Sequence, residues 1–255
     1  MRRRRLVSSR TRRAQARRVR RRVMVLLAVL ALGALAMQPA LRARIAQMGR
    51  EGLSAAQAFA QSLGTDGAQA ELNLPEMEVW ALQLGVFDSG ESAAQEQKRL
   101  AAEGVPCVVW QREKMRLICS VALSREGLDA QAAGGRESFV VKDALPAVSL
   151  RLSASQGDME AALSLLRLPD ALLTRLLDGG EPLDALIDET QRQAERAVTA
   201  HPENALYTQL AQSLVNWCAL MRQTAEACDA QTALVYAQTT MCTLCRELRR
   251  ALAGA

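Results

Sequence analysis

Strand and helix signals alternate most clearly in the stretch from Val79 to Ala122: VWALQLGVFDSGESAAQEQKRLAAEGVPCVVWQREKMRLICSVA. Its first nine residues, Val79–Phe87, alternate and are rich in strand-forming side chains, which predicts a β-strand. Ser92–Glu103 predicts a helix, because an N-capping serine opens it and a glycine follows it. Val105–Trp110 and Met115–Ala122 predict two further strands, joined by a short polar turn.

The same pattern continues for about thirty residues beyond this stretch. Ser124–Ala133 predicts a short second helix, which Gly134-Gly135 ends. Ser138–Val141 begins a fourth strand, with a continuation toward Leu152. The order β-α-β-β-α-β predicts a four-stranded antiparallel sheet with two helices on one face, in a domain spanning residues 76–152.

From residue 153 to residue 255 the strand signals stop, and helical spacing replaces them. Apolar side chains recur every three or four residues along one stripe of each segment, as in a small helical bundle. The predicted helical segments are Asp158–Arg167, a piece that begins at Pro169, Pro182–Ala200, Glu203–Ala227 and Ala230–Leu252. The fold class predicted for the whole chain is therefore α+β.

The N-terminus carries most of the chain's excess positive charge. Residues 1–22 contain 12 Arg and no acidic residue, so the remainder has 32 − 12 = 20 basic groups against 27 acidic ones, a formal charge of −7. The basic pI of the chain therefore comes from this tail and does not indicate a nucleic-acid-binding domain. We predict no nucleic-acid partner. Val23–Leu41 is uncharged and has about the length needed to cross a bilayer as a helix. Arginines before such a span stay on the cytoplasmic side, which places the body outside the cytoplasm.

An alternative for this region is a cleaved signal peptide, because Ala34-Leu35-Ala36 has the small-x-small pattern of a cleavage site. Both interpretations place the body on the same side of the membrane. The long arginine tail favours a retained anchor. Residues 42–75 then predict a juxtamembrane helix, ending near Leu63, and a linker over Gly64–Leu74.

The predicted βαββαβ segment resembles the SPOR domain, a ferredoxin-like family. Three motifs carry the resemblance: the first strand ending in Gln83-Leu84-Gly85-Val86-Phe87, the helix closing Arg99–Pro106, and Met115-Arg116-Leu117 on the third strand. The chain departs from the family at Val121-Ala122-Leu123, where members often have Gly-Pro-Phe, and at Val86, where many have Ser. The resemblance implies binding to peptidoglycan glycan strands stripped of stem peptides, at sites of cell division or sporulation, by a single-pass membrane protein.

The hairpin between the second and third strands suggests which residues touch a glycan. If it turns about Glu113, paired residue numbers sum to 226, and Trp110 lies opposite Arg116. We expect Trp110, Arg116 and Gln83 to share the open face of the sheet and to bind glycan. An indole gives a flat platform for a sugar ring, while Arg and Gln supply hydrogen-bond donors. The alternative is a Trp–Arg pair that only stabilises the hairpin. Trp80 is assigned to core or edge packing.

Six cysteines outside the cytoplasm would permit disulfides. The register above places Cys107 opposite Cys119, and a helical hairpin turning near Asp229 brings Cys218 to the level of Cys242. The alternative is that all six are buried thiols. Cys242-x-x-Cys245 lies in a helical pattern without a second such motif, so no metal or redox site is predicted.

The sequence offers no catalytic set. The single histidine, His201, argues against a zinc-dependent wall amidase. Asp184, Asp188 and Glu189 are interpreted as a solvated helix face rather than as glycosidase carboxylates. We therefore predict a non-enzymatic protein without cofactors, whose partners are peptidoglycan glycan, the membrane and an unidentified protein bound by the helical domain. The alternative function is an extracytoplasmic protein–protein interaction scaffold without glycan binding; a wall hydrolase of unfamiliar type is a third possibility.

Overall fold

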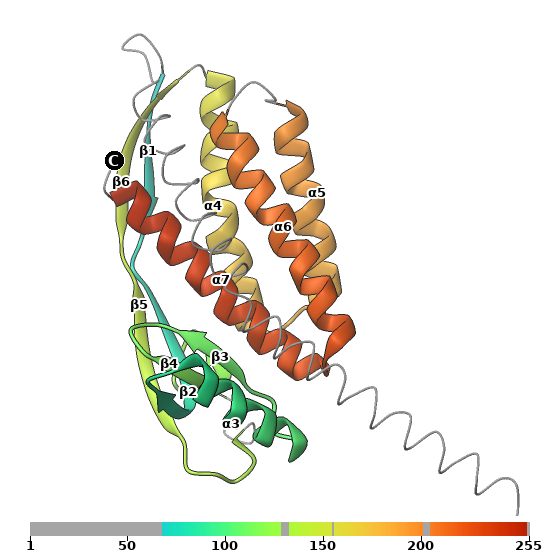
Figure 1. Cartoon of the computed structure of the whole chain (residues 1–255). Helices are drawn as coiled ribbons and strands as arrows, with labels where there is room; N and C mark the ends of the chain where they lie inside the picture. Colours follow the sequence, from blue (N-terminus) through green and yellow to red (C-terminus); the bar gives the residue numbers. More distant parts are fainter. Residues whose placement is uncertain (1–67, 129–132, 155, 201–204, 254–255) are drawn as a thin grey trace, which may run out of the picture.

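The structure is a computed structural model that describes residues 68–128, 133–154, 156–200 and 205–253 (Figure 1). The arginine tail, the predicted span Val23–Leu41 and His201 lie outside these residues. Among the helices of the described ranges, none combines the length and apolarity that a bilayer crossing requires. The described chain is a mixed α+β structure with antiparallel sheets, as predicted.

The main sheet has four antiparallel strands: β2 (Met77–Phe87), β3 (Val108–Gln111), β4 (Met115–Ala122) and β5 (Phe139–Leu145). Their order is β3-β4-β2-β5. Because β4 is antiparallel to both neighbours, β2 and β3 run parallel with β4 between them, which makes β2-α3-β3 a split βαβ unit. Helix α3 (Gly90–Ala102) connects these two strands.

The register of the β3–β4 hairpin is the predicted one. Trp110 pairs with Arg116 and Val109 with Leu117, so the paired numbers sum to 226. Helix α3 begins earlier than predicted, because the Ser89 side chain rather than that of Ser92 caps it by accepting a hydrogen bond from the Ser92 amide (3.1 Å).

The predicted second helix, Ser124–Ala133, is wrong over its described part. Residues 124–128 form bends and turns, and the Ser124 hydroxyl accepts a hydrogen bond from the Gly127 amide (3.2 Å). A serine side chain that bonds to the backbone three residues on favours a turn as readily as a helix start. Gly134 and Gly135 then adopt positive φ angles of 60° and 76°, and the chain turns toward β5.

A long two-stranded ribbon extends from the main sheet along the helical bundle (Figure 1). The described part of the segment predicted as a linker is a strand, β1 (Ala68–Leu74), which pairs with β6 (Val148–Ala154). The linker prediction failed because the alternation of Leu72 and Leu74 with polar residues is short; both leucines are buried.

The ribbon keeps one register on both sides of a proline interruption. Leu74 pairs with Val148 and Met77 with Leu145, and both pairs of numbers sum to 222. Pro75 and Pro146 lie in the gap, where proline has no N–H to donate to the ladder. The ladder is interrupted there, and the carbonyl oxygens of Pro75 and Pro146 accept hydrogen bonds from a side chain instead.

Arg249 donates these hydrogen bonds. Its side chain is 1% exposed, and one guanidinium nitrogen donates to the carbonyl oxygens of Pro75 (2.7 Å) and Pro146 (2.8 Å). The other end of the guanidinium donates to the Asp170 carboxylate, at 2.7 and 3.3 Å, which balances its charge. We call this group the Arg249 clamp.

Four helices form the bundle: α4 (Gln156–Asp178), α5 (Leu183–Ala200), α6 (Ala205–Ala227) and α7 (Ala230–Ala253). The predicted break before Pro169 is wrong, because α4 runs through this residue. A proline inside a helix costs about 3 kcal/mol. Leu165 and Leu166 before it and Leu172 and Leu173 after it are all buried, and their burial offsets that cost.

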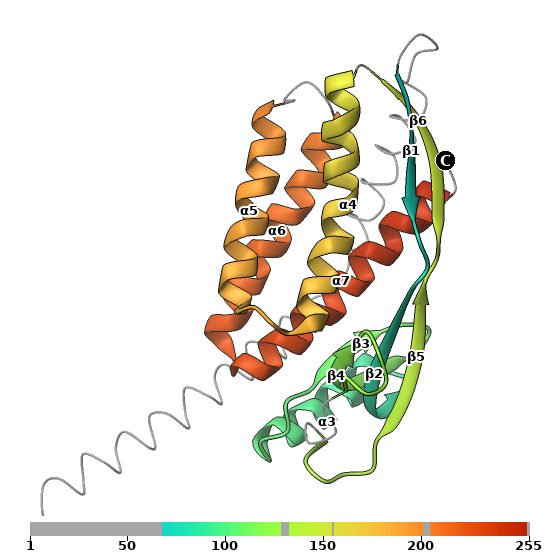
Figure 2. The ribbon, with the colours of Figure 1, turned by 180° about the vertical axis from the view of Figure 1, so that it is seen from behind.

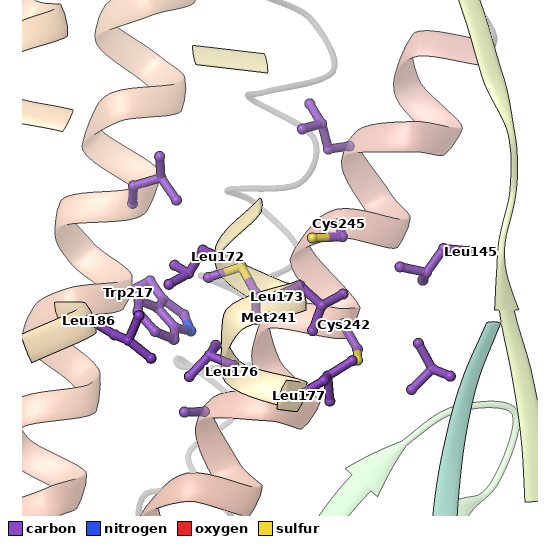
Figure 3. Close-up of a cluster of buried hydrophobic side chains, with 14 of the residues drawn as sticks. Leu145, Leu172, Leu173, Leu176, Leu177, Leu186, Trp217, Met241, Cys242 and Cys245 are labelled. Atoms are coloured by element: carbon purple, nitrogen blue, oxygen red, sulfur yellow. The ribbon is translucent and has the colours of Figure 1, made fainter. Parts of the chain in front are cut away.

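One hydrophobic core joins the sheet to the bundle. Figures 1 and 2 show α7 crossing between the sheet and the other helices. Leucines of α4 pack against Met241, Cys242 and Cys245 of α7, with Trp217 of α6 on the far side (Figure 3). A second, smaller core lies between the opposite face of the sheet and α3, and contains Leu82, Leu100 and Leu117.

Candidate functional site

The three residues predicted to bind glycan come together in the structure. Arg116 lies directly opposite Trp110, and its guanidinium donates to the Gln83 side-chain oxygen (2.8 Å). Their expected position on an open face is wrong, however. Trp110 is 4% exposed and Gln83 is 6% exposed, while Arg116 is half-buried.

Helix α7 covers Trp110. The indole N–H donates to the Thr243 hydroxyl (3.1 Å), and the guanidinium groups of Arg112 and Arg246 lie 5.2 and 5.7 Å from the ring centroid. Both arginines form salt bridges with Asp143 of β5. Burial lowers the pKa of the Arg246 guanidinium, and the nearby Asp143 carboxylate opposes this shift. This face of the sheet is therefore partly a docking surface for α7.

A bulge changes which side chains share the face of Arg116. The β2–β4 register shifts between Leu82 and Gly85, and Val86 pairs directly with Arg116. Directly paired residues of antiparallel strands lie on one face. Strict alternation along the predicted strand Val79–Phe87 would place Val86 on the face of Leu82 and Leu84. This expectation is wrong, because one inserted residue moves every later side chain to the opposite face.

Helix α7 leaves a small part of this sheet face open to solvent. Val86 is 45% exposed, and Phe139, which pairs with Gln83, is 53% exposed. Half-buried Arg116 lies on β4, one strand beyond Val86 and Gln83. We call Val86, Arg116 and Phe139, with Gln83 beneath them, the exposed sheet strip.

Gln83 holds Arg116 in place within this strip. The hydrogen bond that Arg116 donates to Gln83 uses one terminal nitrogen of the guanidinium, and the buried Nε of Arg116 has no hydrogen-bond partner among the described residues. With one terminal nitrogen fixed and Nε buried, the second terminal nitrogen is the donor of this guanidinium left for an acceptor from solvent. Phe139 supplies an exposed aromatic face two strands away. It lies level with Ile118, two residues along β4 from Arg116, so the two positions are about 12 Å apart.

Phe139 is the functional candidate that sequence reasoning missed. It begins β5, an edge strand of the sheet, beside a residue already assigned to the site. The available signal was the short strand Ser138–Val141, in which Phe139 and Val141 alternate with Val140. Val140 pairs with Leu82, which belongs to the core under α3, so Val140 lies on the opposite face.

The other residues singled out from the sequence pack against, or form ion pairs with, neighbouring side chains. Trp80 lies on the interior strand β2 and is half-buried, with the Lys142 ammonium group 5.7 Å from its ring centroid. Asp188 and Glu189 pair with Arg222 and Arg175 on the bundle surface. Over the described ranges, no cluster of His, Cys, Asp and Glu is placed to hold a metal ion.

The six cysteines, all inside the described ranges, carry thiols. Cys218 donates to the Ile187 carbonyl oxygen of α5 (3.5 Å). Burial raises the pKa of Cys107, Cys218, Cys228 and Cys242 to about 12 in each case. At neutral pH these groups are protonated and act as small apolar side chains.

Comparison of the chain with known protein families, curated proteins and solved structures gives no match. The function of the chain is therefore inferred from the residues of the site itself.

Proposed function

We propose that this chain is a membrane-anchored, non-enzymatic protein that binds peptidoglycan glycan strands outside the cytoplasm, at sites of cell division or sporulation. The observation that carries the proposal is the exposed sheet strip, in which Gln83 orients Arg116 on the same sheet face as a solvent-exposed Phe139. The split order of the four strands supports the SPOR resemblance.

Each residue of the strip has a separate role in this proposal. The Phe139 ring gives an apolar platform for the face of a sugar ring. Arg116 donates to sugar hydroxyl, amide or carboxylate oxygens, and Gln83 is a positioning residue that keeps the guanidinium in place. Trp110 stabilises the fold through its contact with α7, and Phe139 rather than Trp110 contacts glycan.

The proposed anchor is Val23–Leu41, with the arginine-rich residues 1–22 in the cytoplasm. A single span would keep the exposed sheet strip near the wall-facing side of the membrane. Anionic lipid headgroups would hold the tail, at about 1 kcal/mol per arginine near the surface.

The test is sedimentation of the purified full chain with wall sacculi, before and after amidase treatment that removes stem peptides. We expect more protein to sediment with the treated sacculi. Equal sedimentation with both preparations, or none with either, would contradict glycan recognition. Release of soluble muropeptides would show a wall hydrolase and overturn the non-enzymatic assignment.

A second candidate function is protein–protein interaction without glycan binding. It is favoured by the burial of Trp110, which leaves little of the sheet face open. An open groove of about 390 Å³ between α4 and α5, lined by Leu165, Leu168, Gln193 and Arg196 among others, would suit a protein partner. Absence of sacculus binding together with a crosslinked partner that is lost in a Leu168→Glu variant would favour this function.

A further inference from the structure

The β3–β4 register, extended by one residue beyond its last pair, places two cysteines opposite each other. Val108 pairs with Ile118 at the start of β3, and one further step of the same register places Cys107 opposite Cys119. Both are buried, and both belong to the core between the sheet and α3. Directly opposed residues of antiparallel strands have Cα atoms about 4.5–5.5 Å apart, which is within the range that a disulfide bridges without backbone movement.

The causes of the raised Cys107 pKa agree with the proximity of the two thiols. Burial is the main cause that raises the pKa of Cys107, and the neighbouring Cys119 is the next. The remaining cysteines lie on the helices α6 and α7 or at the turn between them, where no strand register fixes a partner. Cys242 and Cys245 are one turn apart on a single helix.

We propose that Cys107 and Cys119 form a disulfide when the chain folds under oxidising conditions, and that this bond closes the β3–β4 hairpin. The oxidant is a low-molecular-weight or protein disulfide. One thiolate attacks the oxidant disulfide, forming a mixed disulfide and releasing one thiol. The second cysteine then attacks the mixed disulfide, forms the Cys107–Cys119 bond and releases the second thiol. Two protein thiols are oxidised and one oxidant disulfide is reduced.

The burial of both thiols dictates when the bond forms. A pKa of about 12 for Cys107 leaves very little thiolate at neutral pH in the folded chain, and a side chain in the core has no access to an oxidant. In an unfolded chain, burial no longer raises the thiol pKa, and both thiols are accessible to an oxidant. The bond therefore forms during folding, and the reduced folded protein oxidises slowly.

The experiment uses the full chain, solubilised in detergent, unfolded and reduced, and then refolded in a glutathione redox buffer. Peptide mapping of the alkylated wild-type protein should find Cys107 linked to Cys119. Before alkylation, the mass of the refolded protein should be lower than that of the reduced protein by two hydrogen atoms. The midpoint of urea unfolding should be higher than in the reduced protein and should return to the reduced value with dithiothreitol.

Two variants test the assignment. Cys107→Ala should abolish the bond, whereas a Cys242→Ala/Cys245→Ala control should retain it. Folded, reduced wild-type protein placed in the same buffer should oxidise at least tenfold more slowly than the refolding chain. Recovery of both thiols in reduced form after refolding, or a map that links either of them to a helical cysteine, would overturn the inference. The outcome does not depend on glycan binding, so the two proposals fail separately.

Discussion

Replacing Arg249 with methionine tests how the ribbon is joined to the bundle. Methionine keeps most of the side-chain volume but donates no hydrogen bond. The variant leaves the carbonyl groups of Pro75 and Pro146 without their donor, and it leaves the Asp170 carboxylate, 14% exposed, without its cation.

The expected loss follows from the burial of these groups. Removing one partner of a buried ion pair costs about 3–5 kcal/mol, because the other charge stays buried and uncompensated. For a body of this size, each kcal/mol lowers the melting temperature by about 2–4 °C. We therefore expect Arg249→Met to lower the melting temperature by about 6–20 °C.

The assay is urea and thermal unfolding followed by circular dichroism. Arg250→Met is the matched control: Arg250 is the adjacent residue, its side chain is 60% exposed, and its partner Glu247 lies on the same helix. The control should lose less than about 0.5 kcal/mol. An Arg249→Met variant within about 1 kcal/mol of the wild type would refute the clamp as a stabilising contact between ribbon and bundle.

Two further predictions concern the docking of α7 and the buried thiols. A double-mutant cycle of Trp110→Phe with Thr243→Ala should show a coupling of about 0.5–1.5 kcal/mol from the indole hydrogen bond, and zero coupling would contradict docking through this contact. Under reducing conditions, the contribution of these thiols to stability should be constant below about pH 8 and fall between about pH 8.5 and 12. This is because thiols of the unfolded chain lose their protons first, while burial raises the pKa of Cys107 and three other thiols in the folded chain to about 12. Urea midpoints at pH 8 and pH 10.5 measure this, and equal midpoints would contradict it.

The hairpin register could be predicted from sequence because two alternating strands around a short polar turn leave few ways to bury their apolar faces. Trp110 and Arg116 therefore lie opposite each other as predicted. The helices α5, α6 and α7 were also predictable to within about two residues, because each carries a regular apolar stripe.

The covering of the sheet was not predictable in the same way. An amphipathic stripe shows that α7 has a buried face but does not identify its partner. The signal present in the sequence was the pair Arg246 and Arg249, two charged residues three apart beside apolar positions; both are buried and paired with carboxylates. The bulge near Leu84 is marked in the sequence by Gly85, an isolated glycine inside a strand pattern, which does not show which side chains move to the other face. It explains why Val86 lies on the face of Arg116.

The central claim is that the open part of the sheet, and not the part under α7, contacts glycan. The most direct measurement is quantitative binding of the full chain and two single-residue variants to amidase-treated sacculi. Phe139→Ala removes the exposed ring, and Val140→Ala removes a neighbouring side chain, 38% exposed, on the opposite face. We predict at least a tenfold weaker binding for Phe139→Ala and unchanged binding for Val140→Ala. Wild-type affinity in Phe139→Ala, or equal losses in both variants, would contradict the claim.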